Sequence, residues 1–215
     1  SFTEVSSTHM PLIGEFTWSA EFGDVDGDGD LDLVTATFGP FGQASQNHLL
    51  LNDGSGHFTD VSATHMPPIL EFSESMALGD VDGDGDLDVV FGDTTNGGAI
   101  GTCKLFLNDG TGVFTDASAS HLPASIGDTN RLQVRDVDGD GDLDLLCATV
   151  DAGASSESDR LYLNDGTGVF TDATATNLPA SSEVSTQLAV VDVDGDGDPD
   201  LVCGRIPTPT DSGQN

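Results

Sequence analysis

The chain repeats itself with a period of 56 residues, and this period constrains the fold more than any other feature. The segment DVDGDGDLD begins at Asp24 and returns at Asp80 and Asp136, and DVDGDGDPD begins at Asp192, so each step is 56 residues. Blocks of the types L-x-L-N-D-G and F-T-D recur in the same phase. Periods of this length are typical of arrays built from one supersecondary unit.

Each unit predicts four short strands. Apolar residues alternate before the acidic segment, as at Met76 and Leu78, and residues 31–34 after it predict a second strand. Residues 48–51 and Phe-Thr-Asp at 58–60 predict the third and fourth strands. Asn-Asp-Gly-x-Gly between them predicts a tight hairpin, because glycine adopts positive φ without steric cost. No stretch carries helical periodicity over three turns.

A single four-stranded unit cannot bury both faces of its sheet, but stacked units can, and radial stacking gives a β-propeller. We therefore expect an all-β fold, a β-propeller-type array of four 56-residue four-stranded repeats, forming one domain over residues 1–215. The expected units are approximately residues 2–57, 58–113, 114–169 and 170–206, with a Pro/Thr-rich tail or linker at 207–215.

The last unit is expected to be incomplete or shared, because it lacks the stretch equivalent to residues 48–56. Either residues 205–210 form a degenerate third strand that Ser1–Val5 of the same or another molecule completes, or the Pro-rich stretch is a linker within a longer array. Pro207 and Pro209 favour the linker, since neither can donate to a sheet. In both cases exposed strand edges predict pairing with other copies of the chain or with further repeats.

Charge excludes several classes of partner. Acidic residues outnumber basic ones by 38 to 5, for a formal net charge of −33. Nucleic-acid binding is not expected, because phosphate neutralisation needs Lys and Arg, and an anionic membrane surface is disfavoured for the same reason. No apolar run is long enough to span a bilayer, so membrane insertion is not expected. A signal peptide is either absent or already removed.

The acidic segments are predicted cation sites. Each has carboxylates at positions 1, 3, 5, 7 and 9 and glycine at position 6, where an oxygen-lined loop turns sharply. Calcium, which takes about 6–8 oxygens, would relieve the repulsion and fits better than octahedral magnesium. Zinc is disfavoured because the loops hold no Cys or His. An EF-hand needs Glu at position 12 and a following helix, whereas position 12 is Thr35, Phe91, Cys147 or Cys203, followed by strand residues.

We expect about four Ca²⁺ ions, one per repeat, each held by side chains at positions 1, 3, 5 and 9. By analogy with other Asp-rich loops, position 7 is expected to offer its backbone carbonyl. The expected metal-site residues are Asp24, Asp26, Asp28, Asp30, Asp32, Asp80, Asp82, Asp84, Asp86, Asp88, Asp136, Asp138, Asp140, Asp142, Asp144, Asp192, Asp194, Asp196, Asp198 and Asp200.

The motif D-x-D-G-D-G-x-x-D, followed by L-x-L-N-D-G-x-G-x-F-T-D, resembles the FG-GAP/VCBS-type repeat of integrin-alpha propellers and many secreted bacterial proteins. The resemblance covers essentially the whole chain. It implies that the loop joins the two inner strands of a blade, that calcium is structural, and that the loop's odd positions are the ligands. Pro199, which stands where the other copies have Leu, departs from the pattern and puts the start of the fourth unit's second strand in doubt.

These observations predict an extracellular or cell-surface, secreted, calcium-stabilised module for binding, adhesion or assembly. No catalytic residues are expected, since every acidic pair lies in a repeated loop and catalysis usually needs one asymmetric constellation. Three alternatives stay open: a fibre subunit assembled head to tail through the incomplete blade, a lectin-like module that binds glycans, and an accessory domain of a larger secreted enzyme. A glycan or protein ligand would be recognised by the loops that differ between units, residues 37–47, 93–103 and 150–159.

Overall fold

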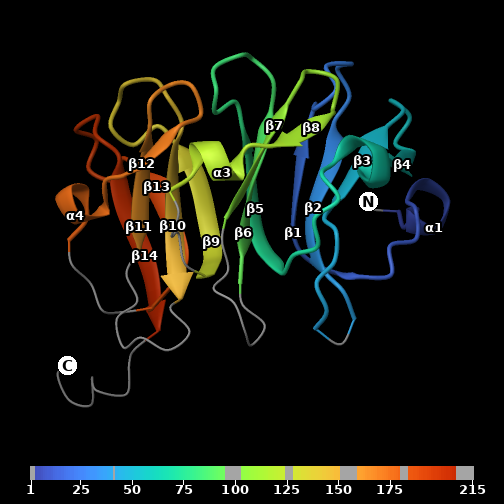
Figure 1. The fold of residues 1–215 in the computed structure, drawn as a ribbon, viewed down its shortest axis with the longest axis horizontal. Helices are drawn as coiled ribbons and strands as arrows, with labels where there is room; N and C mark the ends of the chain where they lie inside the picture. The colour runs from blue at the N-terminus through green and yellow to red at the C-terminus, as the bar shows by residue number, and fades with distance from the viewer. Residues whose placement is uncertain are drawn as a thin grey trace.

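The strands form four antiparallel sheets that follow one another along the chain (Figure 1). The computed structural model describes residues 3–40, 42–94, 103–123, 128–150, 159–179 and 184–206. Three sheets have four strands and the last has two, and in every sheet the strands lie side by side in chain order. The prediction of an all-β repeat fold is confirmed.

The strand bounds repeat from sheet to sheet. The first sheet contains β1 (Phe16–Gly23), β2 (Asp32–Phe38), β3 (His48–Asn52) and β4 (Phe58–Asp60). The second contains β5 (Ser73–Gly79), β6 (Asp88–Asp93), β7 (Lys104–Asn108) and β8 (Phe114–Asp116). The third contains β9 (Asp128–Arg135), β10 (Asp144–Val150), β11 (Arg160–Asn164) and β12 (Phe170–Asp172). The fourth contains β13 (Val184–Val191) and β14 (Asp200–Ile206).

A single helical turn follows the fourth strand of each sheet or its equivalent, which the sequence analysis did not predict. The turns are α1 (Ser6–His9), α2 (Ser62–His65), α3 (Ser118–His121) and α4 (Thr174–Asn177). The Asp that ends the preceding strand caps each later turn: the Asp60 carboxylate, for example, accepts a 3.0 Å bond from Ser62 N. Glu4 accepts the same bond from Ser6 N at 2.7 Å. These bonds satisfy amides that a helix start leaves free.

The sheets are stacked in a row, with their first strands next to one another. Strand β1 contacts β5, β5 contacts β9, and β9 contacts β13. The first and last sheets lie at opposite ends of the row (Figure 1). A separate apolar core fills each junction between neighbouring sheets, so burial depends on the next repeat rather than on one central core.

The junctions are filled by aromatic residues from the outer strands of the following sheet. Phe106 and Phe114 fill the junction between the first and second sheets, and Tyr162 and Phe170 fill the next one. Within the described residues the fourth sheet has no such strands, and a cavity of about 360 Å³ lies between it and the third sheet. Leu146, among others, lines this cavity.

The fourth sheet corrects two details of the sequence analysis. Arg205 pairs with Ser185 and Ile206 with Val184, so both residues extend the second strand and do not begin a third. Pro199 does not disturb the strand start, because β14 begins at Asp200, in register with β2, β6 and β10, and the proline precedes the first paired residue. Residues 207–215 lie outside the described part of the chain.

The N-terminal stretch was expected to start with a fourth strand. Residues 1 and 2 lie outside the described part of the chain, and Thr3–Val5 belong to no strand. The turn α1 that follows lies beside the first sheet, at the other end of the row from the fourth (Figure 1). Among the helices of the described residues, none is long and apolar enough to cross a membrane.

Candidate metal centres

Each acidic loop joins the first strand of its sheet to the second and folds around its own carboxylates. In the first loop, Gly27 and Gly29 adopt φ of +74° and +94°, a left-handed conformation that glycine reaches without steric cost. These turns direct amides inward, and Gly29 N donates to the Asp24 carboxylate at 3.0 Å. Asp28 N donates in the same way to Asp26 at 3.2 Å. The sharp turn predicted at position 6 is confirmed.

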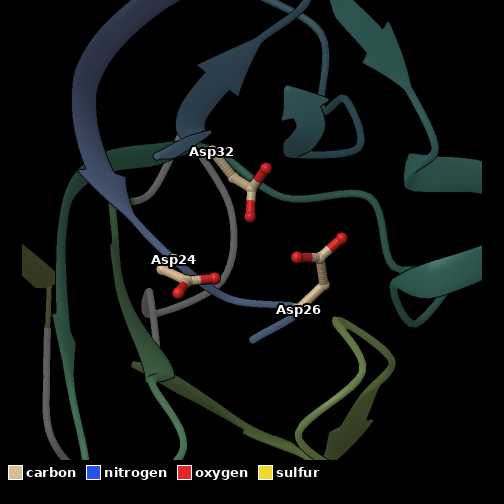
Figure 2. Close-up of side chains that lie close together, drawn as sticks. All are labelled: Asp24, Asp26 and Asp32. Atoms are coloured by element: carbon tan, nitrogen blue, oxygen red, sulfur yellow. The ribbon is translucent and has the colours of Figure 1, made fainter. Parts of the chain in front are cut away.

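Three carboxylates of each loop, at positions 1, 3 and 9, converge on one point. Figure 2 shows Asp24, Asp26 and Asp32 of the first loop directing their oxygens toward a shared space. In every loop one oxygen from each of the three lies within 4.8 Å of the others. The four groups are Asp24, Asp26 and Asp32; Asp80, Asp82 and Asp88; Asp136, Asp138 and Asp144; and Asp192, Asp194 and Asp200.

The carboxylate at position 9 also fastens the loop to the rest of the sheet. Asp32 is fully buried and accepts a 3.1 Å bond from Val25 N and a 2.9 Å bond from Asn52 N at the end of β3. The same two bonds recur at Asp88 and Asp144, and the bond to the loop amide recurs at Asp200. This residue therefore couples the geometry of the loop to the third strand.

Burial makes the ionised form of these carboxylates costly. It raises the pKa of Asp88 to about 6, while hydrogen bonds from Asn108 N and Val81 N act in the opposite direction and the charges of Asp82 and Asp84 add to the rise. Burial likewise raises the pKa of Asp32 and of Asp144. A bound cation would favour the ionised form, because an opposite charge at close range lowers a carboxyl pKa.

The carboxylates at positions 5 and 7 lie outside the convergent groups. Asp28 accepts a 2.9 Å bond from Asp30 N. The Asp30 carboxylate lies against Gly54 of the hairpin turn between β3 and β4, so closely that a β-carbon on that glycine would clash with it. Asp86 and Asp142 lie against Gly110 and Gly166 in the same way. The roles of positions 5 and 7 as ligands stay predictions.

The donor set fits a hard divalent cation. One oxygen of Asp24, Oδ1, is buried and has no hydrogen-bond partner, which is costly for a charged acceptor unless a cation pairs with it. Carboxylate oxygens at this spacing are the ligands that calcium prefers, and the described residues of the groups include no nitrogen or sulfur donor. Calcium at positions 1, 3 and 9 would neutralise charge and hold the loop closed.

The four loops have different surroundings. The turn between the third and fourth strands of the second sheet covers the first loop: a β-carbon on Gly27 would lie 3.5 Å from Gly110 O. The third sheet covers the second loop equally, with 3.3 Å between such an atom on Gly83 and Gly166 O. Within the described residues, nothing lies within 4 Å of the same position on Gly139 or Gly195. The third and fourth loops are therefore more open.

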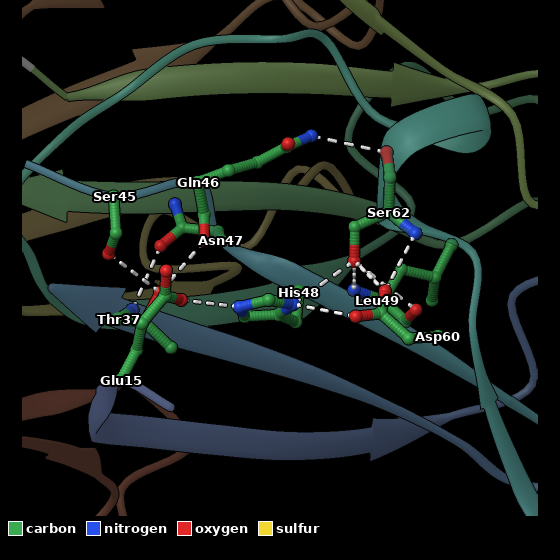
Figure 3. Close-up of polar contacts among 9 residues, drawn as sticks. All are labelled: Glu15, Thr37, Ser45, Gln46, Asn47, His48, Leu49, Asp60 and Ser62. Atoms are coloured by element: carbon green, nitrogen blue, oxygen red, sulfur yellow. Dashed lines mark hydrogen bonds and ion pairs between the residues drawn. The ribbon is translucent and has the colours of Figure 1, made fainter. Parts of the chain in front are cut away.

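The loop at residues 37–47 is the one expected recognition loop that the structure largely describes, and polar contacts hold it in place (Figure 3). Asn47 accepts from Thr37 N at 2.9 Å, and Gln46 reaches Ser62 O at 3.1 Å. His48 beside it lies 2.5 Å from Glu15 and 3.1 Å from Asp60. The other expected recognition loops, 93–103 and 150–159, lie mostly outside the described residues.

A buried acidic pair lies at the junction of the first and second sheets, which sequence reasoning missed. Glu71 lies 3.6 Å from Lys104, the equivalent of His48, and its backbone pairs with Ser45 across the junction. Burial, followed by the charge of Asp93, raises the pKa of Glu71 to about 9. Burial also raises the pKa of Asp93 to about 6. The 56-residue equivalence of Glu15 with Glu71, and of His48 with Lys104, was the available sequence pattern.

Comparison with known proteins agrees with the repeat. The chain matches the FG-GAP-like repeat family over residues 36–91, 94–147 and 136–203. No curated protein sequence matches significantly. Among solved structures, the biofilm matrix protein Bap1 of V. cholerae aligns with a TM-score of 0.47 and 16% identity over 88% of this chain. The aligned part spans 28% of the Bap1 chain.

Proposed function

Because the chain belongs to the FG-GAP-like repeat family, we propose that it is an extracellular, calcium-stabilised module of β-propeller type that serves binding, adhesion or assembly and not catalysis. The observation that carries this proposal is the convergence of three carboxylates at one phase of all four repeats. Four equivalent sites suit structural ions, whereas catalysis usually depends on a single asymmetric constellation of groups.

Electrostatics supports both the ion and the compartment. A net charge of −33 destabilises a compact chain by self-repulsion, and the acidic loops hold more than half of the carboxylates. Extracellular calcium-binding modules work with dissociation constants of about 10⁻⁴–10⁻³ M, which resting cytosol does not satisfy. The radial arrangement is supported by the first strands, which lie side by side where a propeller places its innermost strands.

Thermal unfolding with calcium and with a chelator tests this function. We expect calcium, but not an equal concentration of magnesium, to raise the melting temperature by at least about 10 °C, because ligand binding to the native state stabilises it by mass action. Asp82→Asn should reduce this calcium-dependent shift. The matched variant Asp109→Asn removes a carboxylate outside the convergent groups and should leave the shift unchanged. Equal melting temperatures with calcium and chelator would refute the proposal.

One observation favours a glycan as the bound ligand. Trp18, the single Trp of the chain, is half exposed on β1 and stacks on Phe38 with ring centroids 5.5 Å apart, and exposed Phe16 lies 5.5 Å from the same ring. Exposed aromatic faces are suited to stacking on sugar rings. A glycan array with the wild-type chain and Trp18→Ala tests this candidate: hits that the variant retains, or an empty array, would exclude a role for Trp18.

A further inference from the structure

The two ends of the row expose the residues that are buried at every internal junction. The 56-residue equivalence allows each end residue to be compared with its counterparts inside the row. We define the first-sheet face by Phe22 and Leu31, and the last-sheet face by Val191, Val193 and Val202.

The first-sheet face is the half of a junction that inner repeats press onto the preceding sheet. Its counterparts in the second repeat, Leu78 and Leu87, belong to the core between the first and second sheets, where both lie directly over Gly23. In the first sheet there is no preceding sheet, and Phe22 and Leu31 are 58% and 56% exposed. The exposed part is confined to the inner strand and loop end, since Leu33 and Leu50 are buried.

The last-sheet face is the other half of the same junction. In the first repeat its counterparts Val25 and Val34 are 1% and 0% exposed because they pack against the second sheet. Val193 and Val202 are 64% and 49% exposed. Val191 replaces Gly23, and a larger residue is tolerated at this phase, because Arg135 occupies it at the third junction.

A polar contact has the same two halves. Asn108 donates across the first junction to Val25 O at 2.7 Å, and Asn164 donates across the second to Val81 O at 2.7 Å. Each also bonds the loop of its own sheet. Asn52, the first counterpart, makes only the bond within its own sheet among the described residues, to Leu31 O at 3.1 Å. The acceptor that corresponds to Val25 O on the last sheet is the carbonyl of Val193.

We propose that the first-sheet face of one copy docks on the last-sheet face of a second copy, repeating the internal junction between molecules. Both halves are present on one chain and differ from each other, so the contact is heterologous and continues from copy to copy. The proposal rests on the proposed function and names a second copy of this chain as the assembly partner.

The same geometry makes the contact dependent on calcium. At internal junctions the turn at residues 108–112 covers the loop at 24–32. By equivalence, the turn at residues 52–56 of the second copy would cover the loop at 192–200 of the first. Two uncompensated acidic segments would repel there, and calcium on the loop removes that repulsion.

Sedimentation velocity on the full 215-residue chain, at rising concentration in millimolar calcium and physiological salt, tests the proposal. We expect the wild type to form species larger than a monomer, and chelation to dissociate them. Phe22→Asp and Val202→Asp each spoil one face and should each be monomeric. Val169→Asp places the same charge at an exposed position outside both faces and should associate like the wild type. Circular dichroism and melting identify any variant that fails to fold.

Mixing the two variants gives the sharpest result. Phe22→Asp retains a sound last-sheet face and Val202→Asp a sound first-sheet face, so an equimolar mixture should form dimers and nothing larger. A wild type that stays monomeric, self-association of either variant alone, or a mixture that stays monomeric would each overturn the proposal. These outcomes are separate from the calcium-dependent melting shift, which tests the proposed function and does not depend on association.

Discussion

The second and fourth acidic loops have nearly the same sequence but different surroundings. The second loop lies under the turn of the next sheet, and its Val81 and Asp88 are buried. The fourth loop has no such cover within the described residues, and Val193 and Asp192 are exposed. The comparison teaches that a site in this array is made by two repeats: one supplies the carboxylates, and the next removes them from water.

The largest expected difference is between the equivalent substitutions Asp88→Asn and Asp200→Asn. At position 88 an amide leaves one of two buried amides, Val81 N or Asn108 N, without an acceptor and weakens calcium binding. We expect a loss of about 3 kcal/mol of unfolding free energy there and about 1 kcal/mol or less at position 200. Urea unfolding in calcium measures both, and equal losses would show that the neighbouring turn has no effect.

Calcium titration sharpens the comparison next. We expect isothermal titration calorimetry to resolve two classes of site: the covered first and second loops bind more tightly than the open third and fourth by about tenfold. The physical reason is that lower solvent exposure strengthens the attraction between carboxylates and cation. Asp82→Asn should remove a tight site and Asp194→Asn a weak one. A single class of four identical sites would contradict the comparison.

The acidic pair of an internal junction predicts a pH dependence. The pKa of Glu71 is about 9 in the folded chain and near 4.5 ordinarily, so protonated Glu71 stabilises the fold fully below pH 4.5. That stabilisation is lost as the pH rises through 9. Glu71→Gln stays neutral and should become more stable than the wild type by on the order of 2 kcal/mol between pH 5 and 9. A stability difference that does not change over this range would refute the assignment.

The smallest expected effect separates one hydrogen bond. Asn164 and Asn52 both bond their own turn and loop, but Asn164 alone of the two also reaches the preceding sheet within the described residues, at Val81 O. Asn164→Ala should therefore cost about 1 kcal/mol more than Asn52→Ala. The measurement is urea unfolding at concentrations where the chain is monomeric. Equal costs would mean that the inter-sheet bond contributes nothing to stability.

The repeat phase was enough to predict the strands, the acidic loops and their sharp turns, because these depend on local residue types such as Gly29 and the Asn-Asp-Gly turn. The helical turns were missed because a single turn capped by Asp60 leaves no helical periodicity. The difference between Asp88 and Asp200 was also beyond the sequence. It arises from contact with a turn one repeat further along, and nine nearly identical residues carry no record of that neighbour.

The order of the covering contacts has a consequence for biosynthesis. Each covered loop is completed by a turn that lies C-terminal to it, as residues 108–112 complete the loop at 24–32. A chain leaves the ribosome with its N-terminus first, so every such loop emerges before its cover and finishes folding only when the following repeat has been made. Maturation of the ion sites therefore trails chain growth by one repeat, and a nascent array always carries its least finished site nearest the exit tunnel.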